Sequence, residues 1–415
     1  MKNQVIETAV PQKYLGNLGL MIFITLMNMF IPLSTDLYLP ALPTMGTYFD
    51  SNAAIINLTL SAFFFFYAIG MLIWGPLSDK YGRKPILLAG NLLYLISSVF
   101  CAVAENVYWL IAARAFQGIG AGGITSVSVA MIKDCFTGKK RETILAITQS
   151  MSALAPMLAP IIGVFIIQHV GWRGSFWSLS IIATVNLILT LLYQETLQEH
   201  ERNDGTVLNA IGRLFVVARN KSFFIPAVIF SLSAFPFMGY IAVSSYIYID
   251  YFGVSELEYS YFFATNACLS VAGPFIYVRF LSFCKKNSVA VGAFSLGMIS
   301  GILVMTIGTR SPGLFLLSFI IMSLTGAAIR PFSTNILFDQ LKGDTGSAVS
   351  LMGILFTVMG SGGMVVASLP WGNVVMGLGA IMAIFSAMAL VSWYVFMKSD
   401  IPFVGVKTTL SPQET

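Results

Sequence analysis

The sequence predicts an all-α integral membrane protein whose twelve transmembrane helices form two six-helix halves. Three observations support this fold class: 57% of the 415 residues are hydrophobic, only 10% are charged, and the mean hydropathy is +0.82. A water-soluble protein would have roughly a quarter of its residues charged. A helix needs about 20 residues to cross a hydrocarbon core of about 30 Å, so this length allows about twelve spans. A single water-soluble domain is excluded.

Apolar runs of helical length recur along the whole chain. They are apolar almost throughout, whereas a membrane β-strand would alternate polar and apolar residues over about ten positions. No short apolar core with a small-residue cleavage site precedes the first run, so no cleavable signal peptide is expected. To within a few residues, the expected spans are 17–42, 54–74, 85–104, 107–132, 143–168, 172–193, 223–249, 257–280, 288–309, 311–337, 347–369 and 372–397.

The positions of the basic residues predict the orientation of these spans. If the amino terminus is cytoplasmic, all 23 Lys and Arg except Arg114, Arg173, Arg310 and Arg330 fall in cytoplasmic segments. Basic residues favour the cytoplasmic side, so both termini are predicted there. The predicted parts are an N-terminal half (1–193), a polar cytoplasmic linker (194–222), a C-terminal half (223–397) and a cytoplasmic tail (398–415).

Asp36 is the only one of the 18 acidic residues predicted to lie within a span. A carboxylate in the hydrocarbon region costs about 2.5–3.5 kcal/mol, so such a residue is a candidate functional site. Arg114 is expected at a similar depth, about 10 Å from the outer surface. We hypothesise that both residues line an outer cavity and that Asp36 exchanges its proton against substrate. The alternative is a static buried ion pair that fixes helix packing.

The fourth span carries a stripe of polar and small residues on one face. Arg114, Gln117, Ala121, Thr125 and Ser128 share this face, which suits either a cavity wall or a tight helix contact. We assign Arg114 and Gln117 to the cavity and the smaller residues to packing.

Arg330 lies about seven residues from the predicted cytoplasmic end of the tenth span. A long side chain at this depth can extend back to the membrane surface, and such a snorkelling or structural role is one interpretation. A direct role in substrate binding is the other.

The most specific sequence signal is Gly75-Pro-Leu-Ser-Asp79-Lys-Tyr-Gly82-Arg83-Lys84, which falls in the predicted loop between the second and third spans. Its glycines permit a tight turn and close backbone approach, and its charged residues can cap helix ends or pair across the bundle. This segment resembles the cytoplasmic-loop signature of the major facilitator superfamily.

Three further segments resemble motifs of that superfamily. Leu110-x-x-x-Arg114-x-x-Gln117-Gly118 is similar to the fourth-span motif of its proton-coupled members. Ala155-Pro156-x-x-Ala159-Pro160-x-x-Gly163 is similar to its fifth-span antiporter motif, with Ala155 and Ala159 where glycine is usual. Ser34-Thr-Asp36-Leu-Tyr38-Leu-Pro40-Ala-Leu-Pro43 is similar to the drug/proton antiporters of the bicyclomycin and chloramphenicol resistance branch.

The resemblance implies alternating access in a bacterial inner membrane. It implies proton coupling by Asp36 with Arg114 beside it, and a gate on the cytoplasmic side that includes Asp79 and Arg83. Pro156 and Pro160 remove backbone hydrogen bonds in mid-helix, so the fifth span is expected to kink or to pack closely against a neighbour. That kink is either a hinge or leak seal or a feature fixed by packing.

Aromatic side chains are the expected surface for lipophilic substrates, because they offer apolar area and cation–π contacts without demanding one geometry. The residues predicted to line the substrate cavity are Asp36, Tyr38, Tyr67, Arg114, Gln117, Phe237 and Tyr240.

The leading functional hypothesis is a proton-coupled multidrug exporter of small lipophilic compounds. The alternative is export of a specific native metabolite, such as a sugar, amino acid or siderophore, with incidental drug efflux. The expected partners are drugs, protons and membrane lipid but no nucleic acid, and the protein is expected to act as a monomer. The four cysteines have no metal-type spacing, and no phosphate-binding loop or converging catalytic residues occur, so no cofactor, metal or enzymatic activity is expected.

Overall fold

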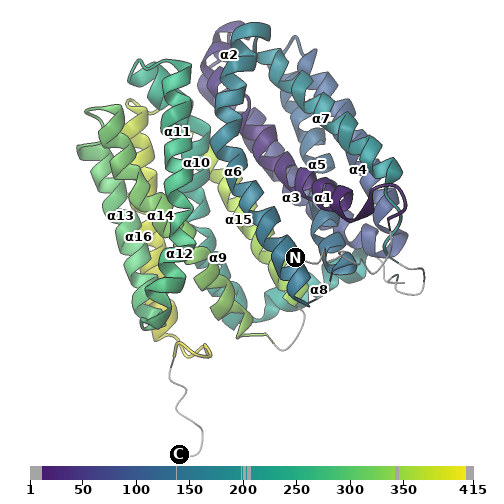
Figure 1. Cartoon of the computed structure of the whole chain (residues 1–415). Coiled ribbons are helices and arrows are strands. Elements are labelled where there is room, and N and C mark those ends of the chain that lie inside the picture. The colour runs from purple at the N-terminus through teal and green to yellow at the C-terminus, as the bar shows by residue number, and fades with distance from the viewer. Residues whose placement is uncertain are drawn as a thin grey trace, which may run out of the picture. The chain divides into compact units, whose positions relative to one another are not determined.

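The structure is a computed structural model that describes residues 12–136, 138–197, 199, 202, 207–341 and 345–407 (Figure 1). Over these residues all regular secondary structure is helical, and twelve segments are long and apolar enough to cross a membrane. The predicted fold class is therefore confirmed. The chain divides into two compact units, residues 1–211 and 212–415. The dividing point falls inside the predicted linker, within helix α8 (Val207–Arg219).

The first unit contains the first six spans, drawn from purple to teal in Figure 1. Asn52 and Asn106 begin the second and fourth spans, since each side chain accepts a hydrogen bond from a backbone N–H of the first helical turn. The elements of this unit are α1 (Gly16–Asp36), a 3₁₀ turn (Leu39–Ala41), α2 (Leu42–Tyr48), α3 (Ala53–Tyr81), α4 (Arg83–Ala102), α5 (Val107–Cys135), α6 (Gly138–Val170) and α7 (Trp172–Leu192).

Helix α5 packs closely against both α3 and α4. A Cβ added at Gly118 would meet the carbonyl of Phe63 on α3, and one added at Gly120 would meet the backbone of Tyr94 on α4. Small residues let membrane helices approach in this way, and the close approach holds the buried side chains of α5 in fixed positions.

The second unit contains the remaining six spans. The rings of Phe230, Phe294, Phe332 and Trp393 pack together in its core, and α13 lies beside α16 (Figure 1). Its elements are α9 (Lys221–Ser231), α10 (Ala234–Ser245), a π-helix (Tyr246–Tyr251), α11 (Glu256–Ser270), α12 (Ala272–Arg279), a 3₁₀ turn (Leu281–Phe283), α13 (Lys286–Thr306), α14 (Pro312–Phe338), α15 (Thr345–Ala367) and α16 (Val374–Lys398).

Three predicted spans are interrupted helices, and one of them, span eight, breaks at Val271 between α11 and α12. Pro40 has no N–H to donate to the carbonyl of Asp36, so α1 ends at Asp36 and the chain turns before continuing to Tyr48. Pro236 likewise cannot donate to the carbonyl of Leu232, and span seven breaks between α9 and α10. The interruption of span one lies at the acidic residue that the sequence singled out.

Candidate functional site

Asp36 is the last residue of α1 and its side chain is almost completely buried, with 4% of the residue exposed. The hydroxyl of Thr35 donates to Asp36 Oδ1 at 2.9 Å. The next residue is fixed as well, because Ser175 Oγ on α7 donates to the carbonyl of Leu37 at 3.3 Å. Asp36 is thus a carboxyl group at a helix end that neighbouring helices hold in position.

Arg114 lies in a buried hydrogen-bond network of the same unit. Its Nε donates to the carbonyl of Thr59 on α3 at 3.2 Å, and its Nη1 donates to Gln117 Oε1 at 2.5 Å. Gln117 Nε2 in turn donates to Ser98 Oγ on α4 at 2.7 Å. Arg114 Nη2 has no hydrogen-bond partner among the described residues. The network therefore joins α3, α4 and α5, and Nη2 of the guanidinium stays unpaired.

Tyr38 connects this network to the segment that carries Asp36. Its hydroxyl lies 3.1 Å from Thr59 Oγ1, and its ring centroid is 5.0 Å from the Arg114 guanidinium, which also stacks on Phe63 at 4.2 Å. Within the described part of the chain no ion pair shorter than 4.0 Å joins Asp36 to Arg114. The static pair considered as an alternative is therefore absent, and aromatic rings surround the cation instead.

Helix α6 carries the predicted antiporter motif and contacts the chain beside Asp36. Pro156 and Pro160 lie inside one continuous helix, and Ala155 is buried. A Cβ added at Gly163 would collide with the carbonyl of Leu37. The fifth span therefore packs closely against its neighbour, one of the two outcomes expected of it.

Gly163→Ala is expected to impair the protein, because the added methyl group must displace either α6 or the Leu37 carbonyl. Overpacking of this kind costs about 1–3 kcal/mol, so we expect a lower melting temperature and weaker transport. Gly292→Ala is the matched control, since a Cβ there meets nothing within 4 Å. Equal melting temperatures for the two variants would contradict this packing.

The predicted gating segment is helical, so its placement in a loop was wrong. Gly75 and Asp79 lie on the last turns of α3, and Arg83 and Lys84 open α4. Only Gly82 separates the two helices, with φ of +99°, a conformation that favours glycine. The apolar run ends at Trp74, but α3 continues to Tyr81, and at the start of α4 Arg83 contacts Asp134 of α5 and Glu195 after α7.

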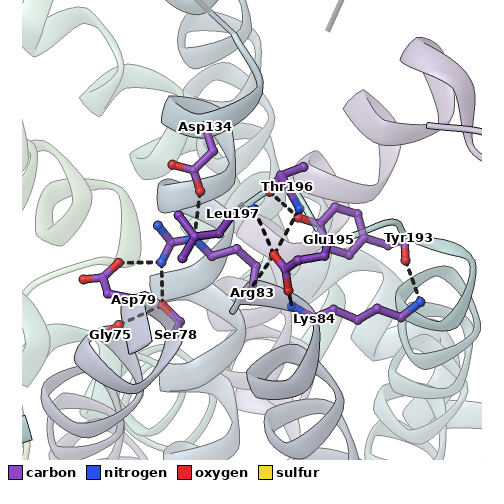
Figure 2. A network of polar contacts seen from close by, with 10 residues as sticks. All are labelled: Gly75, Ser78, Asp79, Arg83, Lys84, Asp134, Tyr193, Glu195, Thr196 and Leu197. Atoms are coloured by element: carbon purple, nitrogen blue, oxygen red, sulfur yellow. Dashed lines mark hydrogen bonds and ion pairs between the residues drawn. The ribbon is translucent and has the colours of Figure 1, made fainter. Parts of the chain in front are cut away.

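Arg83 lies between two carboxylates at the predicted cytoplasmic ends of spans two, three and four (Figure 2). Its Nη1 is 2.6 Å from Asp79 Oδ1, and its Nε is 2.7 Å from Asp134 Oδ2 at the end of α5. Nη1 also donates to Ser78 Oγ at 2.8 Å. Asp134 was not among the predicted residues. Its position at the inner end of the fourth span was the sequence feature that could have indicated this contact.

Glu195, which follows α7, binds the start of α4 (Figure 2). Its carboxylate accepts hydrogen bonds from the backbone N–H groups of Arg83 at 3.0 Å and Lys84 at 2.9 Å. Helix α4 has no capping side chain of its own, so these N–H groups need an outside acceptor. Lys84 Nζ donates in return to the carbonyl of Tyr193 at 2.7 Å.

Glu195→Ala is expected to destabilise the protein by about 1–2 kcal/mol, the range found for lost helix caps. Thermal unfolding in detergent measures the effect. Glu199→Ala is the control, because the Glu199 side chain belongs to the same segment and is 91% exposed. If both variants unfold at the same temperature, Glu195 does not cap α4.

The structure places the predicted aromatic residues in separate surroundings. Tyr67 is buried in the first unit against Phe63, at 6.4 Å between ring centroids. In the second unit Phe237 is half-buried, and Tyr240 stacks on Phe319 at 4.0 Å. The Tyr240 hydroxyl has no hydrogen-bond partner among the residues that the structure describes. Their grouping in one substrate cavity stays a prediction.

Comparison with known proteins gives a family and several relatives. A model of the Major Facilitator Superfamily matches residues 18–366. An uncharacterized MFS-type transporter of Bacillus subtilis (strain 168), YdgK, is 29% identical over 335 residues, which cover 80% of this chain and 83% of that protein. The multidrug resistance protein MdtL of Shigella flexneri serotype 5b (strain 8401) is 26% identical over 378 residues, which cover 88% of this chain and 92% of that protein.

Solved structures share the fold. A D-xylose-proton symporter superposes with a TM-score of 0.73 at 16% identity, covering 93% of this chain and 98% of that one. A bacterial homologue of the human lysosomal transporter Spinster, inward-facing and unoccupied, superposes with a TM-score of 0.70 at 17% identity, covering 91% and 95%.

Proposed function

The chain belongs to the Major Facilitator Superfamily, and we propose that it exports small lipophilic compounds in exchange for protons by alternating access. It is a multi-pass transporter of the bacterial inner membrane and not an enzyme. The name of its MdtL relatives, multidrug resistance protein, supports drugs as cargo. No cofactor is needed in this proposal, because the proton gradient supplies the free energy.

The observation that carries the proposal is the position of Asp36. Its carboxyl group is buried at a helix C-terminus, where the helix dipole is negative, and no cation lies within 4.0 Å of it in the described residues. A proton is therefore the simplest ion to neutralise it. Span one is interrupted directly after Asp36. A small change of the backbone at this interruption would therefore alter the surroundings of the carboxyl group.

The Arg114 network supplies the second part of the proposed mechanism. Its guanidinium contacts Tyr38, two residues from Asp36, and keeps one unpaired donor. We propose that substrate binding changes the position of this segment and so releases the Asp36 proton. Arg83, held by Asp79 and Asp134, is proposed to lock the predicted cytoplasmic ends of spans two to four in one state of the cycle.

Reconstitution tests the proposed function. Purified protein in proteoliposomes should accumulate radiolabelled chloramphenicol when a pH gradient is imposed, and should not when an ionophore collapses the gradient. Each proton contributes about 1.4 kcal/mol per pH unit and about 2.3 kcal/mol per 100 mV. Competition by chemically unrelated drugs would support broad efflux, whereas competition by one metabolite alone would favour a dedicated exporter.

A further inference from the structure

Arg330 is a charged residue in the interior of a span to which no role has yet been assigned. In the spans that the structure describes, the only charged residues away from the span ends are Asp36, Arg114 and Arg330. Arginine stays protonated in proteins, so the two guanidinium groups always carry charge. Within the described spans of the second unit, Arg330 is the one charged residue away from the span ends, so the interior of this unit is net positive and an anion would balance it.

Arg330 does not extend toward the nearer membrane surface. It lies eight residues before the end of α14 at Phe338, a depth of roughly 12 Å, and its guanidinium is 4.2 Å from the ring centroid of Phe356. Phe356 lies eleven residues into α15, roughly 16 Å from the start of that helix. The side chain thus leans toward the helix N-terminus, as helical side chains do, and away from the nearer end of its span. This contact with Phe356 favours the substrate-binding interpretation over snorkelling.

The guanidinium has donors available for a ligand. Among the described residues, no carboxylate lies within 4.0 Å of the guanidinium. Its N–H groups have no hydrogen-bond partner in the described part of the second unit, and the residue is exposed. Arg114, by comparison, is fully buried and uses two of its nitrogens in hydrogen bonds. A positive charge with open donors at this depth is a recognition element for a carboxylate, which accepts two parallel N–H bonds.

There is room for a ligand beside this cation. Gly326 lies one turn before Arg330 on the same face of α14, and Gly353 lies one turn before Phe356 on α15. A Cβ added at either glycine meets nothing within 4 Å. Gly326 also lines a small cavity of the second unit together with Phe294 and Phe385. Arg330 itself does not line this cavity, and the apolar surface in contact with its guanidinium is the ring of Phe356.

We infer that Arg330 binds an acidic group of the transported compound, so that the substrates include aromatic carboxylates and exclude lipophilic cations. This inference rests on the transport function proposed above and gives it a substrate class. A bound carboxylate would cancel the charge of Arg330 inside the second unit. A bound cation would raise that charge to two.

Three probes of one shape test the inference: 2-naphthoate, the neutral 2-naphthamide and 2-naphthylmethylammonium. Isothermal titration of the full chain in detergent should give at least about tenfold tighter binding of the carboxylate than of the amide, and no detectable binding of the ammonium. Arg330→Gln should reduce the carboxylate preference to less than about twofold, and Arg330→Lys should retain part of it because the charge remains. Arg310→Gln, which changes an outer-loop arginine of the same unit, should keep the full preference.

Equal binding of the carboxylate and the amide by the wild type, preference for the ammonium, or a preference that survives Arg330→Gln would each overturn the inference. Chloramphenicol uptake under a pH gradient, measured in parallel, separates the two proposals. Uptake without a carboxylate preference leaves the proposed function standing and removes this substrate class. A carboxylate preference without pH-driven uptake supports the Arg330 site and removes proton coupling.

Discussion

Asp36→Asn is expected to abolish the pH-driven accumulation of chloramphenicol in proteoliposomes. Asparagine has the size of aspartate and can still accept the hydrogen bond from Thr35, but it carries no exchangeable proton. A pH difference of two units contributes about 2.7 kcal/mol per proton, so the variant should lose roughly a 100-fold concentration gradient. Binding of chloramphenicol to the purified variant should remain measurable, because the amide changes coupling and not the surrounding rings.

Asp50→Asn is the matched control for this variant. Asp50 is exposed in the turn between the first two spans, and its φ of +48° is one that asparagine adopts readily. The control should transport as the wild type does. Wild-type accumulation by Asp36→Asn with unchanged pH dependence would remove Asp36 from the coupling mechanism.

Arg83→Gln is expected to have the largest effect on stability. The substitution leaves Asp134, whose side chain is only 15% exposed, without its cation, and it also frees the more exposed Asp79. Removal of one partner from a buried ion pair costs about 3–5 kcal/mol, and the partial exposure of the two carboxylates reduces our expectation to about 2–3 kcal/mol. Thermal or denaturant unfolding in detergent gives the value, and transport should fall with it.

A double-mutant cycle separates the ion pair from general damage to the helix end. Arg83→Gln combined with Asp134→Asn should be less harmful than the sum of the single variants, because the uncompensated carboxylate is then absent. Lys80→Gln is the control, because Lys80 lies next to Asp79 in α3 but takes part in no ion pair among the described residues. This variant should unfold at nearly the wild-type temperature. Additive effects of Arg83 and Asp134 would show that the pair does not contribute as a unit.

The helical architecture was predictable because hydropathy and charge placement act locally along the chain. Twelve apolar runs of spanning length left no other fold class. Ten of the described spans match the predicted ranges within three residues, whereas the first and second spans end six and seven residues later than predicted. The interruption after Asp36 was also within reach of the sequence, since Pro40 removes the N–H that would continue α1. We predicted one continuous span there, because the apolar run continues past the proline.

Side-chain partners were less accessible from the sequence. Glu195 lies 112 positions after Arg83 and Asp134 lies 51 positions after it, so only tertiary packing shows that they meet. A polar residue after a span can always be interpreted as a solvated loop residue. The direction of the Arg330 side chain could not be predicted from the sequence either, because the depth of the residue allows both a snorkelling and an inward orientation. The contact with Phe356 supports the inward orientation.

Proton release on substrate binding tests the central claim most directly. Chloramphenicol is added to the purified full chain in a weakly buffered solution, and a pH-indicator dye records the protons released for each molecule bound. The exchange mechanism predicts release of about one proton by the wild type and by Asp50→Asn, and none by Asp36→Asn. Equal release by the wild type and Asp36→Asn, or binding to the wild type without any release, would contradict it.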